Sequence, residues 1–244
     1  MRKAAAILMA VAVLALGVGA LARSSVFALR HLRIQGVGAA RVTARALALT
    51  RRTSLFLISA RVLARRALKA DPLAARAEVT ITLPHTLTIS LVPRQSVALV
   101  EAASVSDPGA VEGLYGIDAT GRVLPLTRPD VASLPLLTGP GPRPSYLFAE
   151  ESGRWLTTGL AVVRALPRAL RPDVSEIHVG STGDSAELVL MDSRPVLLGF
   201  PQHLSEKFAD LSVLLNRYPW PEYAGTGFDL RDAARPSLFT VGKS

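Results

Sequence analysis

Few side chains in this sequence could do chemistry, and their spacing does not suit catalysis. The four histidines, His31, His85, His178 and His203, never occur in a metal-ligand pattern such as H-x-x-x-H or H-E-x-x-H. The chain has no cysteine, which excludes thiolate catalysis and cysteine metal sites. We therefore expect no catalytic residue, no metal site and no cofactor.

The acidic residues that lie close together in the sequence are better explained by surface charge or turn formation than by acid–base catalysis. Glu150 and Glu151 are adjacent, and Asp184 lies near Glu187. Such pairs are indistinguishable from solvated charge in a sequence. Asp118 comes just before a predicted hairpin turn, where an aspartate most often caps the turn. An exported enzyme such as a hydrolase is an alternative, and it requires a pocket with convergent titratable groups.

The N-terminal residues predict a membrane helix. Met1, Arg2 and Lys3 are followed by residues 4–22, which carry no charge. As a helix these residues would span roughly 28 Å, close to the thickness of a bilayer core. We predict a cytoplasmic tail (1–3), a single transmembrane helix (4–22) and export of the rest. A cleaved signal peptide that ends at the A-x-A-like residues 20–22 is the alternative.

The net charge of +9 is concentrated in one segment. Residues 23–76 contain twelve Arg or Lys residues and one acid, Asp71, whereas residues 77–244 contain fourteen bases and eighteen acids. A basic segment that follows a membrane helix suits an anionic membrane surface. Nucleic acid is not an expected partner, because the aromatic residues of this segment are only Phe27 and Phe56.

The pattern of residues 26–94 predicts the order β-α-α-β-β. Residues 27–36 alternate between apolar and polar side chains, as a half-buried strand does. Two helices are predicted at 43–50 and 59–72, and residues 77–94 form a hairpin that turns at Pro84-His85. Two helices would then cover one face of a three-stranded sheet.

Residues 95–244 predict a second, strand-rich part with two helices. The helices are expected at about 150–166 and at 204–220. Short strands are expected at 96–101, twice within 113–126, and at 134–139, 186–191, 195–200, 227–231 and 236–242. The expected fold class is α+β, with a single N-terminal transmembrane helix and a second domain that is mixed and mostly antiparallel.

Five motifs, taken in order, resemble the FtsQ/DivIB family of bacterial cell-division proteins. They are LRIQG (32–36), the segment from LFLISARVL to RQSVAL (55–99), YGIDATGRVL (115–124), LLGFPQHLSEKFADLSVLL (197–215) and FDLR (228–231). The resemblance implies a POTRA domain at 26–94 and an FtsQ-type β domain at 95–244. One departure is the MDSRP turn (191–195), which lacks the glycine usual in the family.

The resemblance also implies a function. It predicts a non-enzymatic, membrane-anchored divisome scaffold in the bacterial inner membrane at the division septum, with its N-terminus inside and its C-terminal domains outside the cytoplasm. Its partners would be FtsB/FtsL-type proteins, which add a strand to the last strand, and other divisome membrane proteins. Mapped by position, the partner-binding residues are Arg231, Ser237, Leu238, Phe239, Thr240 and Val241.

Two questions stay open at the level of sequence. Alternation puts Leu238 and Thr240 on one face of the last strand and Phe239 and Val241 on the other, and either pair could face the partner. A POTRA-containing transport or secretion component is the alternative function, since a POTRA fold alone does not imply a function.

Overall fold

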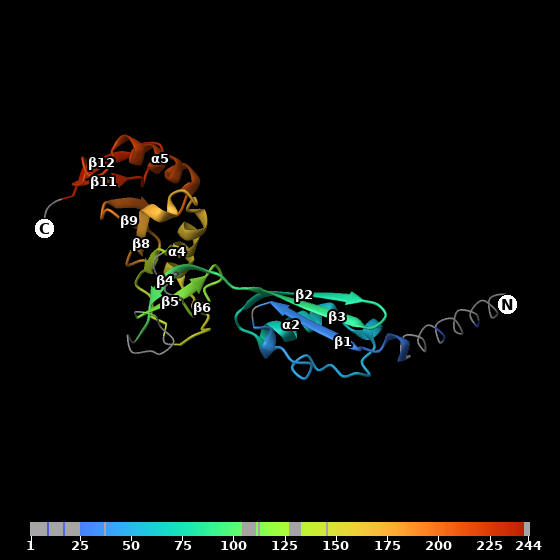
Figure 1. The fold of residues 1–244 in the computed structure, drawn as a ribbon. Coiled ribbons are helices and arrows are strands. Elements are labelled where there is room, and N and C mark those ends of the chain that lie inside the picture. Colours follow the sequence, from blue (N-terminus) through green and yellow to red (C-terminus); the bar gives the residue numbers. More distant parts are fainter. Residues whose placement is uncertain are drawn as a thin grey trace. The chain divides into compact units, whose positions relative to one another are not determined.

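The computed structural model describes two compact units of one chain (Figure 1). Its described residues are 25–36, 38–103, 113–126, 133–144 and 146–241, with the single residues Met9, Gly17 and Val111. Unit 1 comprises residues 1–94, and unit 2 comprises residues 95–244. The expected cytoplasmic tail, 1–3, lies outside the described residues.

The predicted fold class has to be corrected with respect to its transmembrane helix. Within the part of the chain that the structure describes, no helix is long and apolar enough to cross a membrane. The longest α-helix of the described residues is α5 (Leu204–Arg217), which has 14 residues. It spans about 21 Å, whereas a bilayer core needs about 30 Å. Of the residues 4–22 that carried this prediction, only Met9 and Gly17 are described.

Unit 1 is a three-stranded sheet covered on one face by a helix (Figure 1). Leu63 and Ala67 of the helix pack on Leu87, Ile89 and Leu91 of the central strand. The strand order is β1-β3-β2, with β1 parallel and β2 antiparallel to β3. The elements are η1 (Ser25–Phe27), β1 (His31–Gly36), η2 (Ala39–Arg41), η3 (Leu55–Leu57), α2 (Ala60–Ala70), β2 (Ala74–Thr82) and β3 (Thr86–Pro93).

The helix expected at 43–50 is wrong, because residues 44–48 form turns. Thr43 does accept a hydrogen bond from the amide of Ala46, at 3.2 Å, as a helix cap would. However, Ala48 adopts a φ of 53°, which ends the helical path. The amide of Leu49 donates to the carbonyl of Ala44, five residues earlier, at 2.9 Å, whereas an α-helix pairs residues four apart.

Unit 2 is built on a nine-stranded mixed sheet in the order β12-β11-β10-β9-β8-β7-β4-β5-β6. Three neighbouring pairs, β10–β11, β7–β8 and β4–β7, are parallel, and the others are antiparallel. The strands are β4 (Ser96–Glu101), β5 (Leu114–Asp118), β6 (Val123–Leu124), β7 (Leu136–Thr138), β8 (Val174–Val179), β9 (Ala186–Leu190), β10 (Pro195–Gly199), β11 (Thr226–Asp229) and β12 (Ser237–Thr240).

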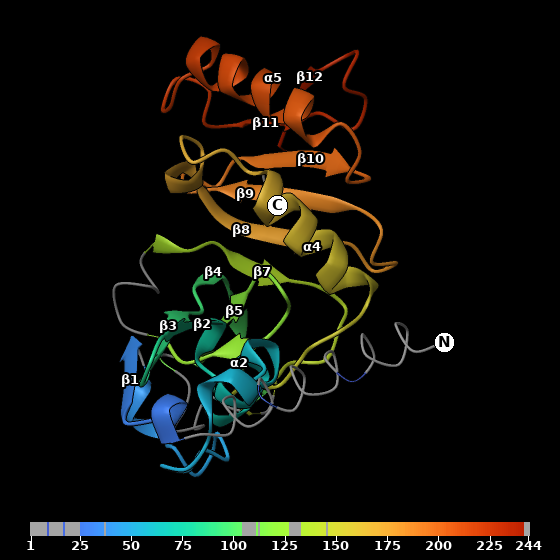
Figure 2. The same cartoon turned by 90° about the vertical axis from the view of Figure 1, so that its right-hand side faces the viewer.

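Helices α4 (Arg154–Ala165) and α5 lie on the same face of this sheet (Figure 2). Every second residue of the strands points into the core beneath them, among them Ile177, Leu188, Val196 and Phe228. Phe208 of α5 is fully buried in the same core. The described residues therefore form an α+β fold with mixed sheets and three α-helices.

Strand β8 was not predicted from the sequence. A register shift between Val174 and Glu176 breaks the alternation at the start of this strand. Val174 and Ile177 are therefore both buried although they are three residues apart. Only Ile177 and Val179 keep a period of two, and one such pair is too short a pattern to predict a strand.

Candidate functional site

Strand β12 is one of the two edge strands of the nine-stranded sheet, and β6 is the other. It pairs on one side with β11 in an antiparallel register that sets Phe228 opposite Leu238 and Gly227 opposite Phe239. No strand among the described residues pairs with its other side. An edge of this kind carries backbone groups to which another chain can bind.

The backbone groups that face outward can be assigned to Leu238 and Thr240. The amide of Val241 donates to the carbonyl of Gly225 at 2.9 Å, so these two residues form a hydrogen-bonded pair of the ladder. Hydrogen-bonded and non-hydrogen-bonded pairs alternate along an antiparallel ladder. Phe239 consequently bonds inward to β11, while Leu238 and Thr240 direct their N–H and C=O groups away from the sheet.

The side chains of β12 divide between two faces. Leu238 shares a face with Phe228, which is buried under the helices, and Leu238 itself stays 38% exposed. Phe239 lies on the opposite face, where its ring covers Gly227. A Cβ atom on Gly227 would stand 2.3 Å from Cζ of Phe239, so this ring position requires glycine.

A groove of 350 Å³ separates β12 from α5. Val213 lines it and is 64% exposed, although valine is apolar. The other lining residues are Asp210, Leu214, Arg217, Tyr218, Pro236, Ser237 and Leu238. The sequence prediction missed the helix side of this groove. The available signal was Val213, an apolar residue outside the buried stripe of α5.

Arg231 lies just after β11 and forms an ion pair with Asp229. Its Nε donates to both carboxylate oxygens of Asp229, at 3.0 and 3.1 Å, and Nη2 donates to Oδ2 at 2.5 Å. These hydrogen bonds lower the pKa of Asp229 and raise the pKa of Arg231. Asp229 is the register partner of Ser237, the first residue of β12. The side chain of Asp229 lies on the face of the sheet opposite to that of Phe228.

The structure therefore places the residues predicted for partner binding in two separate groups. Residues 237–241 run along the edge, although the strand itself ends at Thr240. Arg231 lies apart from this edge, on the β10 side of β11: a Cβ atom on Gly199 would stand 3.1 Å from Cγ of Arg231.

Two buried cations, Arg194 and Lys207, connect α5 to the strands that precede β12. We call α5, β10 and β11 the frame behind β12. Arg194 is 3% exposed and contacts Asp192, the carbonyl of Tyr218 at 2.7 Å, and the ring of Phe228 at 5.1 Å. It thereby joins the β9–β10 turn, the end of α5 and strand β11. Ser193 supplies the positive φ of that turn, 67°.

The second buried cation is Lys207 of α5. Its Nζ donates to the carbonyls of Leu198 at 2.6 Å and Phe200 at 3.1 Å, at the end of β10. Burial lowers the pKa of Lys207, and the nearby charge of Asp232 opposes this shift. The sequence prediction missed both cations, because a lone Arg or Lys usually indicates an exposed position.

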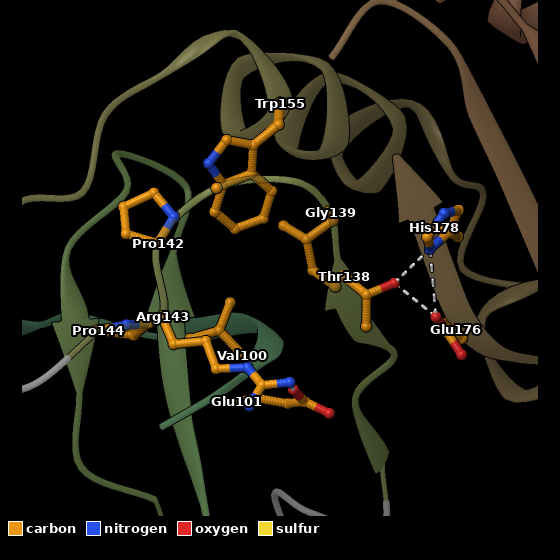
Figure 3. Close-up of a pocket in the computed structure, with 12 residues that line it drawn as sticks. Val100, Glu101, Thr138, Gly139, Pro142, Arg143, Pro144, Trp155, Glu176 and His178 are labelled. Atoms are coloured by element: carbon orange, nitrogen blue, oxygen red, sulfur yellow. Dashed lines mark hydrogen bonds and ion pairs between the residues drawn. The ribbon is translucent and has the colours of Figure 1, made fainter. Parts of the chain in front are cut away.

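A pocket elsewhere on unit 2 gathers titratable groups and bears on the enzyme alternative (Figure 3). Its volume is 320 Å³, and Trp155 forms one wall. The Thr138 hydroxyl lies 2.5 Å from Glu176 Oε1 and 2.8 Å from His178 Nδ1. Thr138 and His178 are register partners on β7 and β8, so their proximity follows from strand pairing. The hydroxyl of Thr138 on β7 therefore bonds to Glu176 and His178 of β8 and links the two strands.

Three of the other acidic residues considered for catalysis, Asp118, Glu150 and Asp184, have structural contacts. Asp118 Oδ1 accepts hydrogen bonds from the amides of Thr120 and Arg122, at 2.7 and 3.0 Å, which confirms its role as a turn cap. Glu150 pairs with Arg122, and Asp184 pairs with Arg154. Within the described residues, no group of three His, Cys, Asp or Glu side chains could hold a metal ion.

These features define a class of protein: an α+β chain in which a mixed sheet ends in a short, open edge strand backed by a helix. A family model described as "Cell division protein FtsQ/DivIB, C-terminal" matches residues 109–231, half of the chain. The chain belongs to the FtsQ/DivIB family of cell-division proteins, which confirms the resemblance seen in the sequence. The match ends at Arg231, so β12 lies beyond it.

A comparison with solved structures finds the major extracytoplasmic domain of the trans isomer of the cell-division protein DivIB from Geobacillus stearothermophilus. It is 16% identical to this chain, with a TM-score of 0.32, and the match covers 52% of this chain and 98% of that one. No curated protein matches the chain.

Proposed function

We propose that this chain is a non-enzymatic scaffold of the bacterial division machinery that binds an FtsB/FtsL-type partner at β12. The observation that carries the proposal is the open edge of β12, where Leu238 and Thr240 present outward backbone groups. The family supports a role in cell division over the transport alternative. Its place of action would be the division septum.

The binding mode would be β-augmentation. A partner strand pairs its backbone with Leu238 and Thr240, and register fixes where its side chains point. Partner residues opposite Leu238 and Thr240 share their face and reach the groove beside α5. Partner residues opposite Phe239 lie on the other face of the sheet.

Unit 1 would serve as a POTRA domain over residues 26–94, ahead of an FtsQ-type domain over 95–244. Its order of one strand, one α-helix and a hairpin, with the first strand parallel to the third, supports this assignment. Partner binding is assigned to unit 2 alone.

The test replaces Thr240 by proline in the full chain. Proline removes the outward N–H and puts its ring where the partner strand must lie, but proline is tolerated on an edge strand whose N–H faces solvent. Phe239, the residue before it, is already in a strand and suits a following proline. We expect affinity for an immobilised FtsB/FtsL-type partner to fall roughly tenfold or more.

The matched control is Thr240→Val, which keeps the N–H and the branched side chain. It should bind like the wild type, and both variants should unfold at the wild-type urea concentration. If Thr240→Pro binds as tightly as Thr240→Val, partner binding does not use the backbone of this edge and the proposal is wrong.

A further inference from the structure

One end of unit 1 exposes a cluster of large apolar side chains, which we call the apolar end. It consists of Val26, Phe27, Phe56, Leu57 and Leu83. Val26, Phe56, Leu57 and Leu83 are 53%, 54%, 63% and 48% exposed. Exposed apolar groups scattered singly need no explanation, but a contiguous group often marks an interaction site.

Three segments far apart in the sequence build the apolar end. Ala28 forms a β-bridge with Ser54, and the amide of Leu29 donates to the carbonyl of Thr53 at 3.0 Å. The amide of Arg30 donates to the carbonyl of His85 at 3.0 Å, which ties in the β2–β3 turn that carries Leu83. The rings of Phe27 and Phe56 meet edge to face, with centroids 4.5 Å apart.

These side chains are separate from the core of unit 1, although they adjoin it in the sequence. Leu29 and Leu55 are 6% and 2% exposed and belong to the core. Leu55 is buried, whereas the next two residues, Phe56 and Leu57, are exposed. The apolar end is therefore surface that the fold of unit 1 leaves uncovered.

The surroundings of the apolar end are cationic. Arg30, Arg51, Arg52 and Arg61 are exposed in the same or adjoining segments. Residues 1–94 contain fifteen Arg or Lys residues against two acids, Asp71 and Glu78. Asp71 is fully buried and pairs with Arg41, and Glu78 lies four residues before the end of β2. Neither acid neutralises the arginines of the apolar end.

We propose that the apolar end inserts into the surface of an anionic membrane, with its arginines at the lipid phosphates. Phenylalanine and leucine flanked by arginine are the side chains that enter the boundary between headgroups and acyl chains. The charge excess selects anionic lipid, because each Arg near such a surface adds attraction. This inference does not depend on partner binding at β12.

The absence of cysteine permits a position-specific test in the full chain. Leu57→Cys is labelled with a small fluorophore, and the protein is mixed with vesicles of phosphatidylcholine and phosphatidylglycerol that contain nitroxide-labelled lipid. The matched control is Met191→Cys in unit 2, since Met191 is 67% exposed and lies outside the apolar end. This comparison separates contact by the apolar end from any other attachment of the chain to the vesicle.

We expect lipid-borne nitroxide to quench the label at position 57 more strongly than the label at position 191. Quenching of the label at position 57 should be weaker in vesicles of phosphatidylcholine alone than in vesicles that also contain phosphatidylglycerol. In the anionic vesicles, Arg51→Ser and Arg52→Ser should each reduce the ratio of inserted to free apolar end about fivefold.

Two results would overturn the proposal. Equal quenching at positions 57 and 191 would show that the apolar end does not enter lipid, and would leave a protein surface as its partner. Quenching at 57 that is unaffected by phosphatidylglycerol and by both arginine substitutions would show that anionic headgroups play no part. Unfolding curves of the labelled variants, compared with the wild type, establish that the fold is retained.

Discussion

Removing the guanidinium of Arg194 is the sharpest test of how the frame behind β12 is held. Arg194→Met keeps an unbranched side chain of similar length but leaves Asp192 and the carbonyl of Tyr218 without their partner. Breaking one side of a buried ion pair costs about 3–5 kcal/mol. Asp192 is 20% exposed and keeps a hydrogen bond from the Arg194 amide, so we expect the lower limit, about 3 kcal/mol.

The assay is urea or thermal unfolding followed by tryptophan fluorescence. Trp155 and Trp220 are the only tryptophans in the sequence, so the signal reports on unit 2 alone. Unit 2 comprises residues 95–244, and for a domain of that size about 3 kcal/mol corresponds to a loss of roughly 6–12 °C in Tm. Arg194→Lys should fall between the wild type and Arg194→Met, because an ammonium cannot make all three contacts.

A double-mutant cycle identifies the cause. Asp192→Asn combined with Arg194→Met removes the orphaned carboxylate, so it should be more stable than the sum of the two single changes predicts. The reasoning is refuted if Arg194→Met costs less than about 1 kcal/mol, the ordinary effect of a substitution. Strict additivity in the cycle would also refute it.

Local patterns in the sequence were enough for the elements whose apolar residues keep a regular period. The β2–β3 hairpin places Val79 opposite Ile89 and Ile81 opposite Leu87, as alternation indicates. Helix α5 buries Leu204, Phe208 and Leu211, as the spacing of four and three predicts. These elements were predictable because each chooses its buried face from neighbouring residues alone.

Features set by distant residues could not be predicted in this way. The face of β12 that carries Phe239 depends on its pairing with Gly227, which the sequence does not give. The burial of Arg194 depends on a carbonyl 24 residues away. The identity of the partner-binding residues stays a prediction: the structure places residues 237–241 along an edge, whereas Arg231 lies against Gly199 of β10.

The edge of β12 is also short, which has a consequence for specificity. Four residues form the strand, and only Leu238 and Thr240 face outward with backbone groups. Pro236 precedes the strand and has no N–H to offer. Short edges and prolines limit pairing between copies of a chain. A partner must therefore add side-chain contacts to two residues of backbone pairing, and the groove beside α5 provides a place for them.

Two further substitutions test the parts of this frame separately. Burial lowers the pKa of Lys207, so the unfolded chain binds the Lys207 proton more tightly than the folded chain does. The wild-type free energy of unfolding should therefore increase as the pH rises toward 10.5, the ordinary pKa of a lysine. Lys207→Met should lack this gain, and parallel stability profiles of the two proteins between pH 8 and 10 would contradict the assignment. Gly227→Ala puts a methyl group 2.3 Å from the ring of Phe239, which must then leave β11. We expect a cost of about 1 kcal/mol in unfolding, the lower limit for overpacking, because the ring is at the surface. In a Phe239→Ala background the same change should cost nothing, since no ring remains to be displaced. An equal cost in both backgrounds would show that Gly227 is required for the backbone and that the ring of Phe239 does not set the face of β12.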